Sequence, residues 1–391
     1  MKDVFVVDAL RTPFGSFGGQ LADVPAHRLA ATVLTRLLDK HQLPASAVSE
    51  VILGQVIQGG CGQAPARQAM RLAGIPDSAG AMTINKVCGS GLKSLMLGAQ
   101  AIACGDAEIV LAGGMESMSM APYAVPSARY GQRMGNAEML DLMIHDALRD
   151  PYSGRHMGEI TEAWIEKNQV SRAEQDDFAE RSYRRAQAAL KNATFAEELV
   201  PVVKAGRKGE VTISEDEEPW KVDFDKLRAL KTVFKKDGSI TAANASTIND
   251  GAAVALLASA EAVKTHNLKP IARVLASATQ SIAPELFPEA PIGAIQKAVA
   301  RAGLQLSDIG LFEINEAFAA VTYVAIRDLG LDPERVNVNG GAVAIGHPVG
   351  ASGARLAATL LREMRARQER YGLATLCIGG GEAVAVIFER L

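Results

Sequence analysis

The sequence predicts an α/β fold in which two similar halves each place a β-sheet between layers of helices. Short apolar runs with strand character alternate with longer segments whose apolar residues recur at helical spacing, an order typical of sheets covered on both faces. The halves also repeat a pattern. Cys88-Gly-Ser-Gly opens a helix that ends before Ile109-Val-Leu-Ala-Gly-Gly, and Gly350-Ala-Ser-Gly opens one that ends before Thr375-Leu-Cys-Ile-Gly-Gly. This duplication predicts two related domains whose helix N-termini face one cleft.

The bulk composition is that of an ordinary soluble globular chain. The 391 residues are enough for two or three domains with a large core. Hydrophobic residues make up 48% of the chain and charged residues 22%. The net charge of −3 gives no excess of positive charge for binding nucleic acid or an anionic membrane. We therefore expect neither kind of partner.

Cysteine and histidine usage points to a reducing compartment. Four cysteines in so long a chain are too few for a disulfide framework, and the N-terminus lacks the regions of a signal peptide. We expect a cytoplasmic enzyme. No apolar run reaches the roughly 18 residues that a membrane span needs. The sequence also has no CxxC pair and no histidines at metal-ligand spacing, so we expect no zinc.

The first half carries the expected elements in alternating order. Apolar residues at Leu29, Val33, Leu34, Leu37 and Leu38 predict a helix over residues 26–40. The other expected helices cover residues 64–73 and 88–104, and the strands cover residues 4–7, 51–57, 81–84 and 109–112. Together with the core-strand composition of residues 251–258, these define an N-terminal domain of residues 1–120 plus 249–268.

The segment from residue 121 to 248 differs in character, and we interpret it as an inserted loop domain over the site. Methionines crowd its first part, which suits a flexible ligand groove but fits loose core packing as well. Ser171-Arg172-Ala173-Glu174 is a capping box that opens a helix to about Lys191. The acidic run 215–218 and the basic run 231–236 are by default solvated surface.

Residues 269–391 form the expected C-terminal domain. Its strands are predicted over residues 271–276, 310–314, 336–338, 373–378 and 383–388, and its helices over residues 292–302, 316–329 and 351–367. A glycine-rich turn connects the strand at 336–338 to the last of these helices.

Cys88 is the first candidate for chemistry. It lies between a short strand and a helix, where unpaired N–H groups and the helix dipole favour a thiolate. Gly89 and Gly91 leave room for a ligand near the backbone. On this stretch alone, a reactive nucleophile and a buried structural cysteine are equally good readings.

Three further motifs favour the nucleophile. They are Asn315-Glu-Ala-Phe, the glycine-rich stretch 337–355 with His347 before Pro348, and Cys377-Ile-Gly-Gly-Gly-Glu. Together with the Cys88 motif they resemble the thiolase family in type, order and spacing, over almost the whole chain. The resemblance implies the thiolase fold, with two duplicated βαβαβαββ domains in five α-β-α-β-α layers and an inserted loop domain.

The resemblance also implies roles for the motif residues. Cys88 takes the acyl group as the nucleophile, His347 is its general base, and Cys377 exchanges a proton at the α-carbon of the second substrate. Asn315 holds a water that forms one oxyanion hole with His347, and the N–H groups of Cys88 and Gly379 form the other. The implied reaction is the reversible condensation of two acetyl-CoA to acetoacetyl-CoA and CoA through acetyl-Cys88, with no other cofactor.

Substrate contacts follow from the same resemblance to short-chain members, including the mitochondrial acetoacetyl-CoA enzymes. His156 and Ser246 match positions beside the acyl and pantetheine groups, Phe287 shapes the acyl pocket, and Trp220 or Lys221 is expected over the adenine. The full set of expected CoA-binding residues is His156, Met157, Trp220, Lys221, Phe234, Ala242, Ser246, Phe287, Ala317 and Phe318.

One position departs from those relatives. Pro219 stands where they have a tyrosine that helps to hold potassium, so we expect no metal, although carbonyls of Ala242, Ala243, Ala245 and Val343 remain. The resemblance further implies a homotetramer built as a dimer of dimers through the loop around Pro122. One alternative is a 3-ketoacyl-CoA thiolase of broader substrate specificity, acting in fatty-acid or aromatic degradation. Another, from a different class, is a thiolase-like protein that binds acyl-CoA or lipid without catalytic activity. A ketosynthase is less compatible, since such enzymes usually pair cysteine with two histidines.

Overall fold

The computed structural model describes residues 2–206 and 209–391 of the chain. One large mixed sheet runs through it in the order β12-β13-β14-β11-β1-β10-β5-β3-β4, with the short β2 (Gly15–Ser16) beside β10. The first half contributes β1 (Val4–Arg11), β3 (Glu50–Gly54), β4 (Gly80–Ile84), β5 (Ile109–Ser117) and β10 (Asn249–Ser259). The second contributes β11 (Ala272–Ser281), β12 (Leu311–Ile314), β13 (Tyr371–Ile378) and β14 (Glu382–Arg390).

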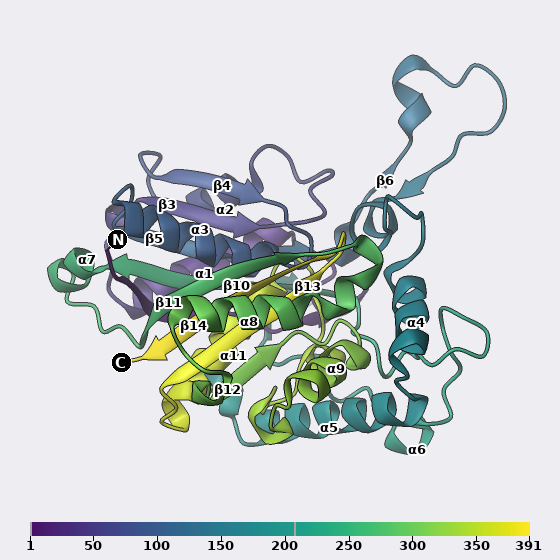
Figure 1. The fold of residues 1–391 in the computed structure, drawn as a ribbon. Helices are drawn as coiled ribbons and strands as arrows, with labels where there is room; N and C mark the ends of the chain where they lie inside the picture. The colour runs from purple at the N-terminus through teal and green to yellow at the C-terminus, as the bar shows by residue number, and fades with distance from the viewer. Residues whose placement is uncertain (1, 207–208) are drawn as a thin grey trace.

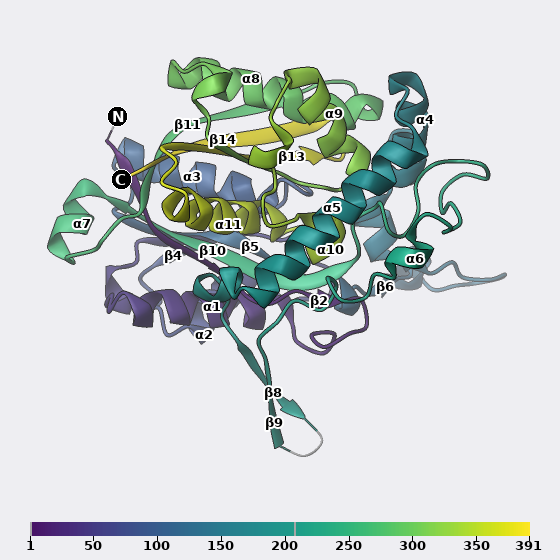
Figure 2. The same ribbon diagram turned by 90° about the horizontal axis from the view of Figure 1, so that it is seen from below.

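The helices and the two halves of the sheet form five layers, as Figure 2 shows. Helices α1 (Ala26–Lys40) and α2 (Pro65–Leu72) cover one outer face, and α8 (Ala290–Ala302) and α9 (Ala319–Leu329) cover the other. Helices α3 (Ser90–Cys104) and α11 (Ser352–Ala366) lie between the half-sheets in a shared apolar cluster. The predicted α-β-α-β-α arrangement is confirmed.

Glycines let the two middle helices meet at their N-termini. A Cβ on Gly91 would lie 2.9 Å from the backbone N of Ala354, and one on Gly353 would lie 2.4 Å from that of Leu92. No side chain fits between the helices there, so the first turns of α3 and α11 touch backbone to backbone. The two helix N-termini therefore lie together, which agrees with the prediction that they face one cleft.

The α3 region also passes a simple length and hydropathy test for a membrane span. Among the described helices it alone does so, over Val87–Cys104 with a mean hydropathy of 1.2 and 56% of the window buried. Because α3 lies between two sheets of this chain, its apolar composition is explained by core packing.

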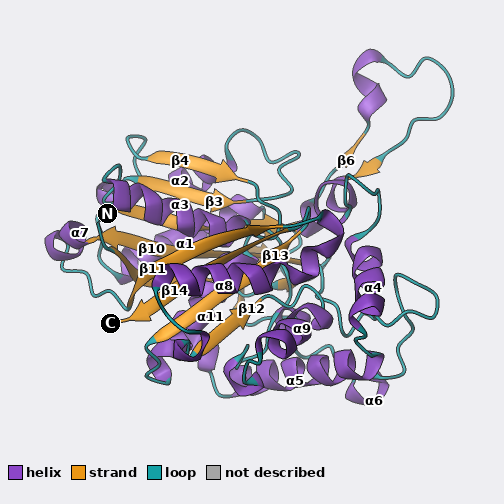
Figure 3. Ribbon diagram, viewed as in Figure 1, coloured by secondary structure: helices purple, strands orange, loops and turns teal. Residues whose placement is uncertain are grey.

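The segment between β5 and β10 supplies the elements outside the layers. An arm projects from β6 (Tyr123–Ala124) and β7 (Leu140–Asp141), as Figure 1 shows. The hairpin of β8 (Val202–Gly206) and β9 (Gly209–Ile213) projects from another part of the molecule, next to α1 (Figure 2). Helix α5 (Arg172–Lys191) lies beside α9, α6 (Phe224–Leu227) lies against α5, and α4 (Met157–Asn168) packs on the turn before α8 (Figure 3). The capping box is confirmed, since Ser171 Oγ accepts the N–H of Glu174 at 3.2 Å.

Several expected boundaries differ from the structure. Strand β3 ends at Gly54, and β5 continues to Ser117. Helix α9 begins at Ala319 because Phe318 is extended, with φ −140°. The strand expected at 336–338 is reduced to one bridge between Val336 and Phe312. Helix α4, the short α10 (Ala342–Ile345) and the two hairpins were not predicted.

The expectation that the acidic run 215–218 is solvated is wrong at its centre. Asp216 is only 1% exposed, and its carboxylate accepts two hydrogen bonds from the Arg11 guanidinium at 2.7 and 2.8 Å. The Nε–H of Arg11 donates to Glu198 at 2.6 Å, and the backbone N–H of Phe14 also donates to Asp216. A buried arginine at the end of β1 thus draws the acidic run inward.

Replacing Asp216 should destabilise the fold strongly. Asp216→Ala leaves the Arg11 charge buried with half of its partners, which typically costs about 3–5 kcal/mol. Chemical denaturation of wild type, Asp216→Ala and the exposed neighbour variant Glu215→Ala measures the effect. We expect a clear drop in midpoint for Asp216→Ala alone, and equal midpoints for the two variants would contradict the packing described.

Candidate active site

The Cys88, His347 and Cys377 motifs meet at one cavity of about 290 Å³. Eleven of the residues singled out from the sequence line it: Cys88, His156, Met157, Phe234, Ser246, Phe287, Ala317, Phe318, His347, Cys377 and Gly379. The wall is completed by residues that the sequence did not single out as ligand contacts: Met118, Ile144, Ala147, Leu148, Val233, Ala245, Thr247, Ile248 and Val349. The cavity is narrow and apolar, and two thiols and two imidazoles in its lining can move protons or bond covalently.

Cys88 occupies a tight turn just before α3. Val87 has φ +46°, a left-handed value that is unusual for a β-branched residue. The hydroxyl of Ser90 closes the turn, since it accepts the N–H of Lys86 at 2.8 Å and donates to the carbonyl of Val87 at 2.7 Å. The strain at Val87 is consistent with a turn built to present the next side chain.

The Cys88 sulfur is held as a neutral thiol, which corrects the expectation of a thiolate. Burial raises the pKa of Cys88 to about 11, although the nearby backbone N–H groups of Gly379 and of Cys88 itself act in the opposite direction. Desolvation therefore outweighs the N–H groups and the helix N-terminus in the resting site. Those same N–H groups lie where charge on a bound carbonyl oxygen could be stabilised.

His347 is fixed at its backbone and at its ring. Its backbone N–H donates to Asn249 Oδ1 at 2.8 Å, and its Nδ1 lies 2.5 Å from Ser352 Oγ. Gly346, with φ +110°, is required because a Cβ there would lie 2.5 Å from Asn249. Nε2 has no hydrogen-bond partner among the described residues. Burial, with a smaller contribution from the Arg355 charge, lowers the pKa of His347 to about 3, so the ring is neutral at physiological pH.

Cys377 lies on β13, and Asn315 follows directly after the neighbouring strand β12. Cys377 is buried near the end of β13, and burial together with the nearby Cys88 sulfur raises the pKa of its thiol above the ordinary range. The backbone N–H of Asn315 donates to Thr375 at 3.0 Å. Neither side-chain amide atom of Asn315 has a hydrogen-bond partner in the described part of the chain, so the amide is free to bind a water or a substrate oxygen.

An aromatic stack forms one wall. His156 caps α4, with Nδ1 accepting the N–H of Gly158 at 3.0 Å, so in the neutral ring Nε2 carries the proton. Its ring stacks on Phe234 at 4.8 Å, and Phe234 meets Phe318 edge-on at 6.2 Å. Gly158 makes this stack possible, because a Cβ there would lie 2.3 Å from the Phe234 ring.

Ser246 ties this wall to the Asn315 motif. Its hydroxyl and its backbone N–H both donate to the carbonyl of Ala317, at 3.0 and 3.1 Å. Ala245 forms an antiparallel bridge with Phe318 next to it. The segment after Asn315 is therefore extended because it pairs with residues from before β10.

Three expected CoA-binding residues do not line the cavity. Lys191 Nζ lies 5.5 Å from the centre of the Trp220 ring, and Lys221 bonds to Ser16 and pairs with Glu217 at 3.2 Å. Ala242 is exposed and also lies outside the lining. Asn315, too, is absent from the lining and lies behind it.

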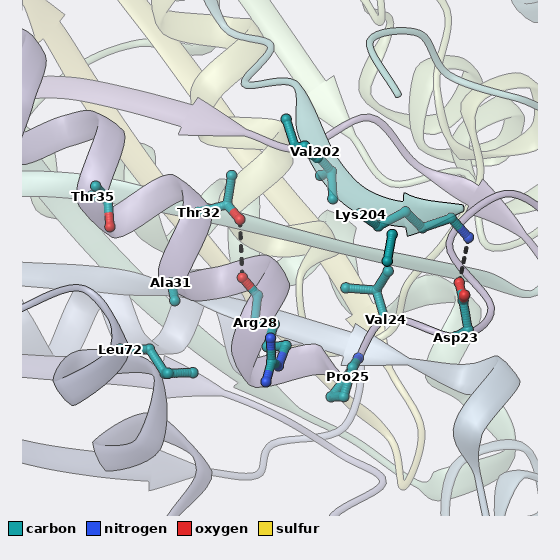
Figure 4. Close-up of a pocket in the computed structure, with 12 residues that line it drawn as sticks. Asp23, Val24, Pro25, Arg28, Ala31, Thr32, Thr35, Leu72, Val202 and Lys204 are labelled. Atoms are coloured by element: carbon teal, nitrogen blue, oxygen red, sulfur yellow. Dashed lines mark hydrogen bonds and ion pairs between the residues drawn. The ribbon is translucent and has the colours of Figure 1, made fainter. Parts of the chain in front are cut away.

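A second hollow of about 600 Å³ lies between α1 and β8 (Figure 4). It is flanked by the ion pair of Lys204 with Asp23 and floored by Val24, Ala31 and Leu72. Its lining holds no cysteine or histidine among the described residues, so the narrower Cys88 cavity is the better candidate for chemistry. In the same described ranges, no three His, Cys, Asp or Glu residues are grouped to hold a metal ion.

The Cys88 cavity is suited to acyl transfer through a thiol. A neutral imidazole can take a proton from Cys88 as the sulfur attacks a carbonyl, and backbone N–H groups at a helix N-terminus can bind the resulting oxyanion. A second thiol and a free amide lie behind the first, where a second proton transfer can take place.

Comparison with known proteins agrees with this chemistry. Residues 4–261 match the thiolase N-terminal domain, and residues 268–390 match the thiolase C-terminal domain. The chain is 50% identical to an acetyl-CoA acetyltransferase of Pseudomonas aeruginosa over 100% of both chains. It is 45% identical to a mitochondrial acetyl-CoA acetyltransferase of Danio rerio, covering 100% of this chain and 92% of that one.

The fold comparison gives the same answer. The crystal structure of the Bacillus anthracis acetyl-CoA acetyltransferase superposes with a TM-score of 0.97 at 40% identity, covering 100% of this chain and 99% of the other. Two matched domains, full-length relatives and a cavity with two cysteines and two histidines lead to one conclusion: this chain belongs to the thiolase family.

Proposed function

We propose that the protein is an acetyl-CoA C-acetyltransferase that condenses two acetyl-CoA reversibly into acetoacetyl-CoA and CoA. The observation that carries the proposal is the meeting of Cys88, neutral His347 and Cys377 around one narrow apolar cavity. The names of the full-length relatives, acetyl-CoA acetyltransferases of bacteria and of a mitochondrion, support the choice of acetyl-CoA as substrate.

In the first half-reaction Cys88 becomes acetylated. His347 Nε2 accepts the thiol proton as the sulfur attacks the thioester carbonyl, and the N–H groups of Cys88 and Gly379 bind the oxyanion. When the C–S bond to CoA breaks, the departing sulfur takes the proton of Cys377. The site then holds acetyl-Cys88, a protonated His347 and a Cys377 thiolate.

The second half-reaction uses these two new charges. Cys377, whose pKa is raised by burial, is a strong base as a thiolate and removes the α-proton of the second acetyl-CoA. Protonated His347 and a water on Asn315 stabilise the enolate oxygen. The enolate carbon attacks acetyl-Cys88, the C–S bond to Cys88 breaks, and His347 returns the proton to that sulfur.

The size of the cavity favours a short acyl group. About 290 Å³ must hold the reacting acyl groups and the end of the pantetheine arm, and Phe287, Phe318 and Val349 occupy its walls. A broader 3-ketoacyl-CoA thiolase would need a longer tunnel between these side chains. We further propose that the enzyme acts in the cytoplasm.

Acetylation of Cys88 and the role of Cys377 are testable together. Incubation with acetyl-CoA should leave an acetyl group on Cys88 of the wild type and, more slowly, of Cys377→Ser, where water must supply the proton to the departing CoA sulfur; peptide mass spectrometry measures both. Condensation should fail in Cys377→Ser because a serine hydroxyl is a far weaker acid than a thiol.

The control is Cys104→Ser, an exposed cysteine outside the site, which should behave as wild type in both assays. An acetyl label on Cys377 in wild-type protein would reverse the assigned roles. Near-normal condensation by Cys377→Ser would remove Cys377 from the α-carbon step.

We also propose a homotetramer assembled from dimers. Strand β4 ends the large sheet with an unpaired edge and carries an exposed Met82, which suits pairing with a second copy. The arm between β6 and β7 presents Tyr130 at 88% and Met134 at 92% exposure. Such side chains are unusual on a solvated loop and common at interfaces.

Sedimentation should therefore give a tetramer of the wild type. Replacing Tyr130 and Met134 together by serine should give dimers, because only the arm contact is weakened. Tyr152→Ser, an exposed tyrosine outside the arm, is the matched control and should remain tetrameric. A wild-type monomer at micromolar concentration would contradict both interfaces, and a wild-type dimer would contradict the arm contact.

A further inference from the structure

The hydroxyl of Ser352 lies between the ring of His347 and a backbone carbonyl. Ser352 Oγ is 2.5 Å from His347 Nδ1 and 2.9 Å from the carbonyl oxygen of Pro348. Ser352 is buried and occupies the first position of α11, a helix in the middle layer. Both neighbours are fixed, so the hydroxyl has two partners at well-defined positions.

The duplicated half of the chain contains a comparable hydroxyl whose orientation is fixed. Ser90 is the counterpart of Ser352 at the first position of α3. Ser90 can only accept from the N–H of Lys86, and it therefore donates to the carbonyl of Val87 in its own turn. The carbonyl oxygen of Pro348 can only accept, so a Ser352 hydroxyl that keeps its 2.9 Å hydrogen bond to this oxygen donates there and offers a lone pair to His347.

We propose that Ser352 is a positioning residue that keeps the proton of neutral His347 on Nδ1, so that Nε2 faces the cavity as a free base. The assignment rests on the proposed function and deepens it. Ser352 is the only partner that the described residues give to either ring nitrogen of His347. The neighbouring side chain of Asn249 is already occupied by the His347 backbone, Thr247 and Gly15.

The arrangement serves both protonation states of the ring. In the neutral state Nδ1–H donates to Ser352, and Nε2 accepts the Cys88 proton. In the protonated state Nδ1–H still donates to Ser352, so the hydroxyl need not turn during the reaction. A dipole that is already oriented avoids the cost of reorganisation in the transition state.

Three variants separate positioning from simple loss of packing. Ser352→Ala removes the acceptor, and Ser352→Thr retains a hydroxyl. Ser94→Ala is the matched control, because Ser94 is a buried serine of α3 whose hydroxyl donates only to backbone carbonyls. Rapid quenching and mass spectrometry measure the rate of Cys88 acetylation by acetyl-CoA, and steady-state assays give kcat and KM. Nitrogen-15 NMR of labelled histidine, assigned with His347→Asn, reports the tautomer of His347 without substrate.

We expect the rate of Cys88 acetylation and the tautomer of His347 to change together. Wild-type His347 should carry its proton on Nδ1, and Ser352→Ala should lose this preference. Its acetylation rate and kcat should fall about tenfold or more with little change in KM, since oriented acid–base catalysis contributes roughly 10²–10⁴-fold. Ser352→Thr should recover most of the rate, and Ser94→Ala should stay within about twofold of wild type.

Two results would overturn the assignment. One is a wild-type His347 with its proton on Nε2, which is decided on wild-type protein even where Ser352→Ala fails to fold. The other is acetylation by Ser352→Ala at the rate of Ser94→Ala. A wild type that is not acetylated by acetyl-CoA would instead contradict the proposed function, and the tautomer measurement would still test Ser352.

Discussion

The site depends on the close contact between the first turns of α3 and α11. A Cβ on Gly91 would lie 2.9 Å from the backbone N of Ala354, and one on Gly353 would lie 2.4 Å from the backbone N of Leu92. Glycine is the only residue that these distances admit. Because the two helices belong to different halves of the chain, their contact is what brings the Cys88 turn against the His347 turn.

Burial is the consequence of that contact, and it sets the chemistry. The same layers that align the two turns shield His347 almost fully and Cys88 in part from water, which raises the pKa of Cys88 and lowers that of His347. Each charged form is disfavoured until a substrate arrives. We therefore infer that the resting enzyme holds no thiolate–imidazolium pair. The proton is transferred from Cys88 to His347 as the sulfur attacks the thioester.

Most of the fold could be predicted from the sequence, because its signals are local. The apolar spacing of α1 and the capping box of α5 gave the correct ends of both helices. The catalytic motifs were also visible, since each is a short run at a strand end or turn. The roles of the individual residues remain a proposal, and so does the division into an inserted domain and two flanking domains.

What the sequence did not reveal depends on contacts between distant segments. Asp216 is buried by Arg11, which lies about two hundred positions earlier, so charge patterning alone placed it wrongly in solvent. Ile144 and Leu148 line the cavity from a single π-helical turn over Met143–Leu148, which the 3.6-residue spacing of an α-helix does not predict. The thiolate expected for Cys88 followed from the helix N-terminus alone, whereas the structure adds the larger effect of desolvation.

In the free enzyme Cys88 is a neutral thiol, and the imidazole of His347 is neutral as well. The rate of alkylation by iodoacetamide, followed at Cys88 by peptide mass spectrometry from pH 6 to 10, tests it on wild-type protein, with exposed Cys104 as the internal reference. A raised pKa means that the thiolate is scarce below it, so the rate at Cys88 should rise about tenfold for each pH unit without levelling off by pH 10. A rate that is already constant from about pH 7 upward would reveal a preformed thiolate and contradict the account.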